Sequence, residues 1–181
     1  MKKIVFFILG LMVFFTEITV AQEQNEEVEE SEGRHSLGLV IAHSRIGQGR
    51  DADGNKQFTS VPSFALDYNY WLAPKFAIGI HTDFLNENFY IESEDEGKLI
   101  ERERPIAPAL MGTYKPGEHW SFGLGFGGEF AKGENYFVTR VGIEYGVEIR
   151  NGWEVLATLT QDFRAKAYNV TSLGLGIEKH F

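Results

Sequence analysis

Cysteine is absent from the 181 residues of this chain. Its absence excludes disulfide bonds and also excludes an N-terminal cysteine that could carry a lipid. Positive charge is in deficit, because 17 Lys and Arg stand against 26 Asp and Glu, which gives a net charge of −9. That balance does not favour nucleic acid as a partner.

Long hydrophobic runs are absent beyond the N-terminus. Hydrophobic residues make up 43% of the chain, yet the mean hydropathy is only −0.20, so no later window can be a membrane-spanning helix. A membrane β-barrel is not detected by hydropathy, because its strands alternate apolar and polar residues. The length predicts one domain.

The first 33 residues contain two segments of opposite character. Lys2 and Lys3, the apolar run 4–15 and the small residues 19–21 predict a Sec signal peptide over 1–21. A helical membrane anchor is the alternative, which the shortness of the run disfavours. Residues 22–33 are acidic and nearly free of apolar side chains, which predicts a disordered leader.

The remaining chain, 34–181, contains segments with a two-residue period. In the last one, Leu173, Leu175 and Ile177 fall on one face, whereas Gly174 and Glu178 fall on the other. Eight segments of this kind are found, at about 34–46, 58–72, 76–84, 106–114, 120–130, 137–149, 153–164 and 170–181.

The connections between these segments alternate in length. Short turns are expected at 73–75, 115–119 and 151–152, and longer loops at 47–57, 92–98, 131–135 and 165–169. An even number of strands places both ends of the barrel domain on the short-turn side. Aromatic residues gather near both ends of the strands: Tyr70, Phe76, Tyr114, Trp120, Tyr145, Trp153 and Phe181 at the short turns, and Phe84, Phe130, Phe137 and Phe163 at the loops.

These features predict an all-β fold, an eight-stranded antiparallel up-and-down transmembrane β-barrel. The alternative is a soluble barrel of the lipocalin kind, with its polar face outside. Glycines such as Gly123, Gly125 and Gly127 lie on the polar face and suit a narrow lumen, which favours the membrane barrel.

The pattern resembles the small eight-stranded outer-membrane family that includes the OmpA transmembrane domain and OmpX. The resemblance implies export to the cell outer membrane, contact with outer-membrane lipid and lipopolysaccharide, and a monomer. It also implies that Phe181 is an assembly signal read by the barrel assembly machinery. Lys179 departs from the family, which usually has an outward apolar residue there; near the interface its side chain can snorkel.

Charged side chains are predicted to fill the polar face. The central set is Asp67, His81, Asp83, Glu129, Arg140, Glu144, Asp162 and Arg164, accompanied by Glu148, Glu154, Glu178 and His180. One interpretation is a narrow cation-preferring pore. The favoured one is a lumen packed with mutually satisfied polar groups, because eight strands leave room only for side chains. Arg140 is expected to lie at the same height along the barrel as Glu129 and Asp162, and to pair with them.

No catalytic or metal site is predicted, and no cofactor. His43 and Ser44 suggest comparison with barrel enzymes that modify lipid A, but neighbouring strand residues point to opposite faces and cannot form a nucleophile–base pair. Residues 51–55 (DADGN) open like a calcium loop but lack the later Gly and Glu of an EF-hand, so a polar turn is expected.

Function is expected in the segment 86–104, where strand character continues beyond a bilayer-length barrel. Arg102 and Arg104 are assigned to outward positions that lipid would not accept, which predicts a hairpin projecting from the membrane with an edge free for a partner strand. Its tip (Glu92, Glu94, Asp95 and Glu96) could gather divalent cations or simply be solvated. The prediction is a structural or surface-interaction protein with an extracellular protein partner, and a barrel that survives deletion of 88–101.

Overall fold

The computed structural model describes residues 33–51, 53–92, 99–165 and 167–181. The predicted signal peptide, 1–21, and all of the predicted leader except Gly33 lie outside the described residues. So do Glu94, Asp95 and Glu96 of the hairpin tip. Among the described residues, no helix is long and apolar enough to cross a membrane.

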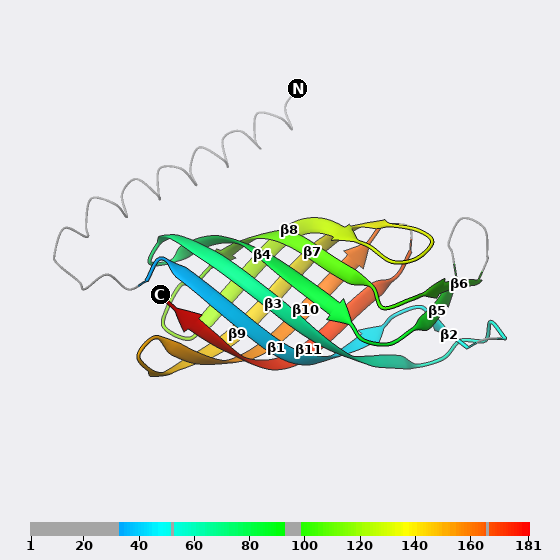
Figure 1. Cartoon of the computed structure of the whole chain (residues 1–181), viewed down its shortest axis with the longest axis horizontal. Helices are drawn as coiled ribbons and strands as arrows, with labels where there is room; N and C mark the ends of the chain where they lie inside the picture. Colours follow the sequence, from blue (N-terminus) through cyan, green and yellow to red (C-terminus); the bar gives the residue numbers. More distant parts are fainter. Residues whose placement is uncertain (1–32, 52, 93–98, 166) are drawn as a thin grey trace, which may run out of the picture. The chain divides into compact units, whose positions relative to one another are not determined.

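Eight long strands form a closed barrel in which each strand pairs antiparallel with its neighbours (Figure 1). They are β1 His35–Ile46, β3 Thr59–Ala73, β4 Phe76–Leu85, β7 Ile106–Tyr114, β8 Trp120–Glu129, β9 Tyr136–Arg150, β10 Trp153–Arg164 and β11 Asn169–His180. The order around the barrel is β1-β11-β10-β9-β8-β7-β4-β3, so β1 closes the sheet against β11. The predicted all-β, eight-stranded antiparallel barrel is confirmed.

The apolar face of each strand lies on the outside. On β11, Leu173 and Leu175 are 66% and 68% exposed, whereas the inward Ser172 and Glu178 are buried. Because a soluble barrel would bury its apolar face, the lipocalin-like alternative is wrong. Aromatic pairs stand at both ends of the outer surface, with Phe76 on Tyr114 at the short turns and others, such as Phe64 on Phe84, at the loops.

The last residues complete the barrel at the short-turn end. The Phe181 N–H donates to the His35 carbonyl at 2.8 Å, and the His35 N–H donates back at 3.0 Å. The Phe181 ring faces outward and stacks on His35. Lys179 turns toward the polar end of the barrel, where its ammonium donates to the Asn151 carbonyl and lies 5.8 Å from the Trp153 ring. This contact is the snorkelling expected for a cation near an interface.

Glycines let β7 and β8 approach closely. A Cβ on Gly125 would lie 2.2 Å from the Leu110 carbonyl oxygen, and one on Gly127 would lie 2.0 Å from the Pro108 carbonyl oxygen. Both contacts involve backbone atoms, which cannot move aside as a flexible side chain could. The inward glycines of β8 are therefore required by the local approach of the strands.

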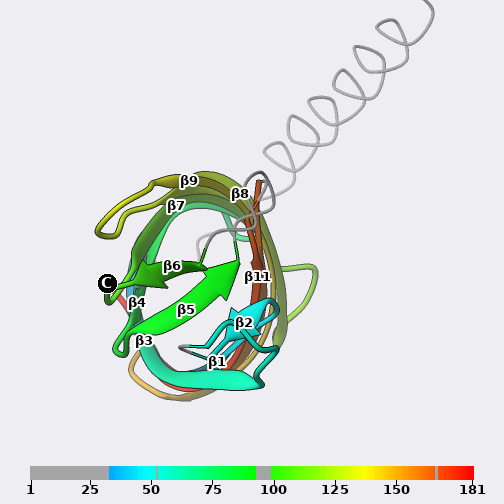
Figure 2. The same ribbon diagram turned by 90° about the vertical axis from the view of Figure 1, so that its right-hand side faces the viewer.

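A second, smaller sheet lies at the loop end. It consists of β2 Gly49–Arg50, β5 Phe89–Glu92 and β6 Leu99–Arg102, in the order β2-β5-β6. Seen from that end, these strands lie across the opening of the barrel (Figure 2). Within the segment 86–104, β5 and β6 pair antiparallel as predicted, while residues 93–98 between them lie outside the described residues; one edge of β5 is already paired with β2.

Candidate functional site

The loop end of the barrel is closed by an apolar cluster. Phe89 and Ile91 of β5 point down from the small sheet and are 3% and 0% exposed. They pack with side chains from four barrel strands and from the loop before β11: Ile46, Val61, Leu85, Ala167, Tyr168 and Val170. Burial of side chains such as Phe89 and Ile91 contributes about 1.5–3 kcal/mol each. We call this cluster, with the sheet above it, the cap.

The cap corrects two expectations about the hairpin. A hairpin that only projected into solvent would leave Phe89 and Ile91 exposed, whereas both are buried. Deletion of 88–101 would remove these side chains and open the cluster, so we now expect the deletion to destabilise the barrel instead of leaving its folding intact. β6 still offers a sheet edge, and no other strand among the described residues pairs with its outer side.

Beneath the apolar cluster, six charged side chains alternate in sign. They form the chain Arg102–Glu129–Arg164–Asp162–Arg140–Asp83. Arg102 lies 2.5 Å from Glu129, and Arg140 lies 2.7 Å from Asp162 and 2.9 Å from Asp83. Three cations and three carboxylates balance, so a dry lumen can hold them. We call these six residues the charge ladder.

Glu129 joins the upper two arginines of the charge ladder. It accepts from both Arg102 and Arg164, and the Tyr168 hydroxyl lies 2.6 and 2.7 Å from its two oxygens. The two guanidinium groups also lie over aromatic rings, Arg102 over Tyr136 and Arg164 over Tyr168. Burial raises the pKa of the Tyr168 phenol, which keeps it protonated as a donor to Glu129.

The outward assignment of Arg102 is wrong, because its side chain is fully buried against Glu129. The two-residue period fails between Arg102 and β7, where Arg104 has a φ of +40° and Pro105 follows. This kink bends the hairpin over the mouth and turns Arg102 inward. Arg104 remains exposed.

The short-turn half of the lumen carries more negative than positive charge. Glu154 pairs with Lys115 at 3.0 Å and with His180 at 3.4 Å. Glu178 pairs with the same His180 at 3.2 Å. Glu144, in contrast, has no hydrogen-bonding or ionic partner among the described residues. In this half of the lumen, three carboxylates (Glu144, Glu154 and Glu178) therefore accompany one lysine, Lys115. In the charge ladder, by contrast, carboxylates and cations are equal in number.

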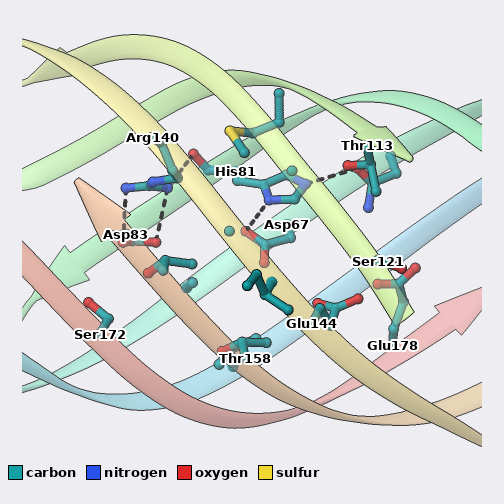
Figure 3. A pocket seen from close by; sticks show the side chains of 18 of the residues that line it. Asp67, His81, Asp83, Thr113, Ser121, Arg140, Glu144, Thr158, Ser172 and Glu178 are labelled. Atoms are coloured by element: carbon teal, nitrogen blue, oxygen red, sulfur yellow. Dashed lines mark hydrogen bonds and ion pairs between the residues drawn. The ribbon is translucent and has the colours of Figure 1, made fainter. Parts of the chain in front are cut away.

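Asp67, His81 and Glu144 border a cavity of about 70 Å³ (Figure 3). His81 Nε2 lies 2.9 Å from the Asn69 amide oxygen, but its Nδ1 lies 3.8 Å from Asp67 Oδ1, beyond hydrogen-bond range. Asp67 Oδ1 is buried with no hydrogen-bond partner. The lining is mixed, with apolar side chains such as Met111 and Val40 beside these polar groups, and a cavity of this volume can hold several water molecules that supply such partners.

The structure places the eight predicted lumen residues inside the barrel but divides them into two groups. Asp83, Glu129, Arg140, Asp162 and Arg164 belong to the charge ladder. The remaining three, Asp67, His81 and Glu144, line the cavity, which Asp83 and Arg140 of the charge ladder also line. Arg140 pairs with Asp162 as expected, but Glu129 pairs with Arg102 and Arg164 instead. Glu148 pairs with the inward Glu154 of β10 and so lies on the polar face as predicted, but it is exposed, because it stands at the short-turn end of β9 beyond the packed lumen.

The remaining sequence candidates lie outside the lumen or apart from one another. His43 faces outward, near the Ser60 hydroxyl, whereas Ser44 faces inward and bonds to Ser63 and Ser172. Across the described part of the chain, no three His, Asp or Glu side chains are arranged to hold a metal ion.

The DADGN segment is a polar turn, as expected. Asp51 accepts from the Asp53 and Asn55 backbone N–H groups at 3.0 and 2.8 Å. The Asn55 amide also donates to it, and these bonds lower the pKa of Asp51. The carboxylate that could have opened a calcium loop is thus engaged in capping its own turn.

Solved structures with the same fold are outer-membrane proteins. OprG of Pseudomonas aeruginosa has a TM-score of 0.57 and 12% identity, over 83% of this chain and 98% of that one. Ail, the attachment invasion locus protein of Yersinia pestis, in complex with the heparin analogue sucrose octasulfate, has a TM-score of 0.53 and 18% identity, over 83% and 100%. Neisserial surface protein A has a TM-score of 0.51 and 9% identity, over 84% and 100%.

No family model matches the sequence, and a comparison with curated proteins gives no match. At sequence identities below 20%, these structures show a shared fold but do not show that this chain binds the same ligands. The chain has the fold of the small eight-stranded outer-membrane β-barrels, with the apolar exterior and polar interior of that class.

Proposed function

We propose that the protein resides in the outer membrane as a non-enzymatic, closed barrel whose cap is a contact surface for an extracellular protein. The observation that carries this proposal is the small sheet itself. Its buried face is held by Phe89, Ile91 and Arg102, so its outer face is a rigid surface. A pre-ordered surface loses little conformational entropy when a partner binds.

The edge of β6 supports a partner that binds as an extended strand. An unpaired edge presents N–H and C=O groups that a segment of another chain can match. Glu101 is exposed on β6, and Tyr90 lies opposite it on β5. A carboxylate beside an aromatic ring favours a basic segment over a polyanion such as the one in the Ail structure. The net charge of −9 agrees with that choice.

The contact surface is tested by a double variant, Tyr90→Ser with Glu101→Arg, displayed on Gram-negative cells. We expect cells carrying the wild-type protein to adhere to epithelial monolayers or to one another, and the double variant to fall to the level of empty cells. Glu118→Arg, the same charge change on a short turn at the other end, is the matched control and should adhere normally. Equal adhesion of cells with the wild-type protein, the double variant and Glu118→Arg would show that the cap is not the contact surface.

Placement in a bilayer is tested separately by Leu175→Arg. Leu175 lies midway along β11 and faces outward, where an arginine in the bilayer midplane costs about 2–4 kcal/mol of folding free energy. Thr171→Arg, on the same face nearer the loop end, should cost no more than about 1 kcal/mol. Urea unfolding of both variants in lipid vesicles measures the difference. Two equally small effects would mean that lipid does not surround the barrel.

A narrow cation-preferring pore is the second candidate, because carboxylates are in excess around the cavity. The buried charge ladder and the apolar cluster stand against it, since both fill the lumen at the loop end. Planar-bilayer recording separates the candidates: steady, cation-selective conductance of the wild-type protein would favour the pore and contradict the closed barrel.

A further inference from the structure

A groove of about 320 Å³ lies on the outer surface of the barrel at the loop end. It runs over β1, β10 and β11, and its lining is Arg45, Gly47, Gln161, Phe163, Asn169 and Thr171. Neither the lumen nor the cap contributes to it. The side chains in this lining occupy the outward positions of their strands, where the rest of the face is apolar.

Strand pairing aligns the polar side chains of the groove in one row. Arg45 on β1 pairs with Thr171 on β11, and Thr171 pairs with Gln161 on β10. The Thr171 hydroxyl donates to the Gln161 amide oxygen at 2.6 Å, which fixes the two side chains relative to each other. Three neighbouring strands therefore present hydrogen-bonding groups at one level.

The row is suited to an anion. No carboxylate lines the groove, and Arg45 forms no ion pair among the described residues; its guanidinium lies 5.1 Å from the centre of the Phe58 ring. In contrast, each guanidinium of the charge ladder is paired with carboxylate. The Asn169 side-chain amide also has no hydrogen-bond partner within the described chain. Guanidinium and amide N–H groups together are typical phosphate donors.

The surface below the row is apolar apart from His43. His43 and Leu173 come next toward the short turns, followed by Ile41 and Leu175. Ile41 is 74% exposed and Leu175 is 68% exposed. A ligand that matched both zones would carry an anionic head at the level of Arg45 and hydrocarbon chains alongside Ile41 and Leu175.

We propose that this groove binds the phosphorylated sugar head of an outer-leaflet glycolipid, with Arg45 as the phosphate contact. The inference rests on the proposed outer-membrane placement, because only there does a lipid head lie at this level. Phe58 and Phe163, exposed beside the row, stand where aromatic side chains meet the head-group region. The continuous apolar strip favours a membrane lipid over a soluble anion.

The test uses refolded protein in detergent micelles and lipid A as the probe, with the dissociation constant measured by native mass spectrometry. Arg45→Gln should weaken binding about tenfold, the effect of losing one charge-assisted contact. Arg45→Lys keeps the charge and should lose less. Arg150→Gln, exposed at the opposite end of the barrel, is the matched control and should bind like the wild type.

Two further arms identify the ligand chemistry. Lipid A without phosphate groups should bind the wild-type protein and Arg45→Gln equally weakly. Inorganic phosphate at millimolar concentration should fail to displace lipid A; displacement would show a phosphate-ion site and overturn the lipid assignment. Equal affinity of wild-type and Arg45→Gln protein for intact lipid A would overturn the site. The adhesion of the cap variants and the unfolding of Leu175→Arg do not depend on Arg45. A failure of the lipid site can therefore be distinguished from a failure of the proposed function.

Discussion

Replacing Glu129 with alanine should lower the free energy of unfolding by about 3–5 kcal/mol, the usual effect of removing one member of a buried ion pair. Glu129 is fully buried and is the carboxylate shared by Arg102, Arg164 and the Tyr168 hydroxyl. Without it, two guanidinium groups remain in the lumen with a single carboxylate neighbour, Asp162, on the Arg164 side. Both guanidinium groups are buried, and Arg102 would keep one hydrogen bond, to the Glu134 carbonyl at 2.6 Å.

Urea unfolding in lipid vesicles measures this effect, with heat-dependent gel migration as the check that the variant has folded. Glu129→Gln keeps an acceptor for Tyr168 but not the charge, so it should fall between alanine and the wild type. Glu118→Ala, on an exposed turn, is the control and should change stability by no more than about 0.5 kcal/mol. A loss below 1 kcal/mol for Glu129→Ala would show that water solvates the two arginines and that the cap is not tight.

The barrel strands could be predicted from the sequence because the signals that define them are local. The alternation of Leu173, Leu175 and Ile177 with smaller or polar residues depends only on the chain's two-residue period. The short turn at Asn151 and Gly152 is equally local, and both residues have positive φ angles in the structure. The long β10 and β11 each bury one face in the same register throughout, so the period is not interrupted.

The cap could not be predicted, because its signals are short or distant. β2 contains only Gly49 and Arg50, too few residues to show a period. Tyr168 lies in a loop, and only the folded chain brings it to Glu129, 39 residues away. For Arg102, the alternation was extended from β7 across a kink that reverses the side chain. The sequence signal for this kink was Arg104 next to Pro105, at the end of the hairpin.

The partners of the charge ladder depend on how the strands are staggered around the barrel. Sequence places Arg140 and Asp162 at similar heights, and direct pairing of β9 with β10 joins them. Asp83, in contrast, lies on β4 and reaches Arg140 across the lumen from β9. Strands tilt in a barrel, so residues at equal distance from their turns are not level. Cross-lumen contacts therefore require the closed structure.

Replacing Arg140 with alanine should also cost about 3–5 kcal/mol, by leaving Asp83 and Asp162 without their shared cation. Arg140 is 1% exposed and makes two hydrogen bonds to Asp162, at 2.7 and 2.8 Å. Arg164 cannot replace it fully, because its contact with Asp162 is longer, at 3.4 Å, and Glu129 also engages it. Arg150→Ala, exposed at the short-turn end of β9, controls for simple loss of a guanidinium and should be nearly neutral.

A double-mutant cycle decides whether the cost comes from unpaired charge or from lost packing. If unpaired carboxylate dominates, Arg140→Ala combined with Asp162→Ala should be less destabilising than the sum of the two single variants, by about 0.5–3 kcal/mol. A packing effect alone would follow side-chain volume, so Arg140→Met, which keeps most of the volume without the charge, would then be nearly neutral. A loss under 1 kcal/mol for Arg140→Ala would mean that water already compensates these charges. The loop half of the lumen would then contain water, and the narrow pore would replace the closed barrel as the favoured interpretation.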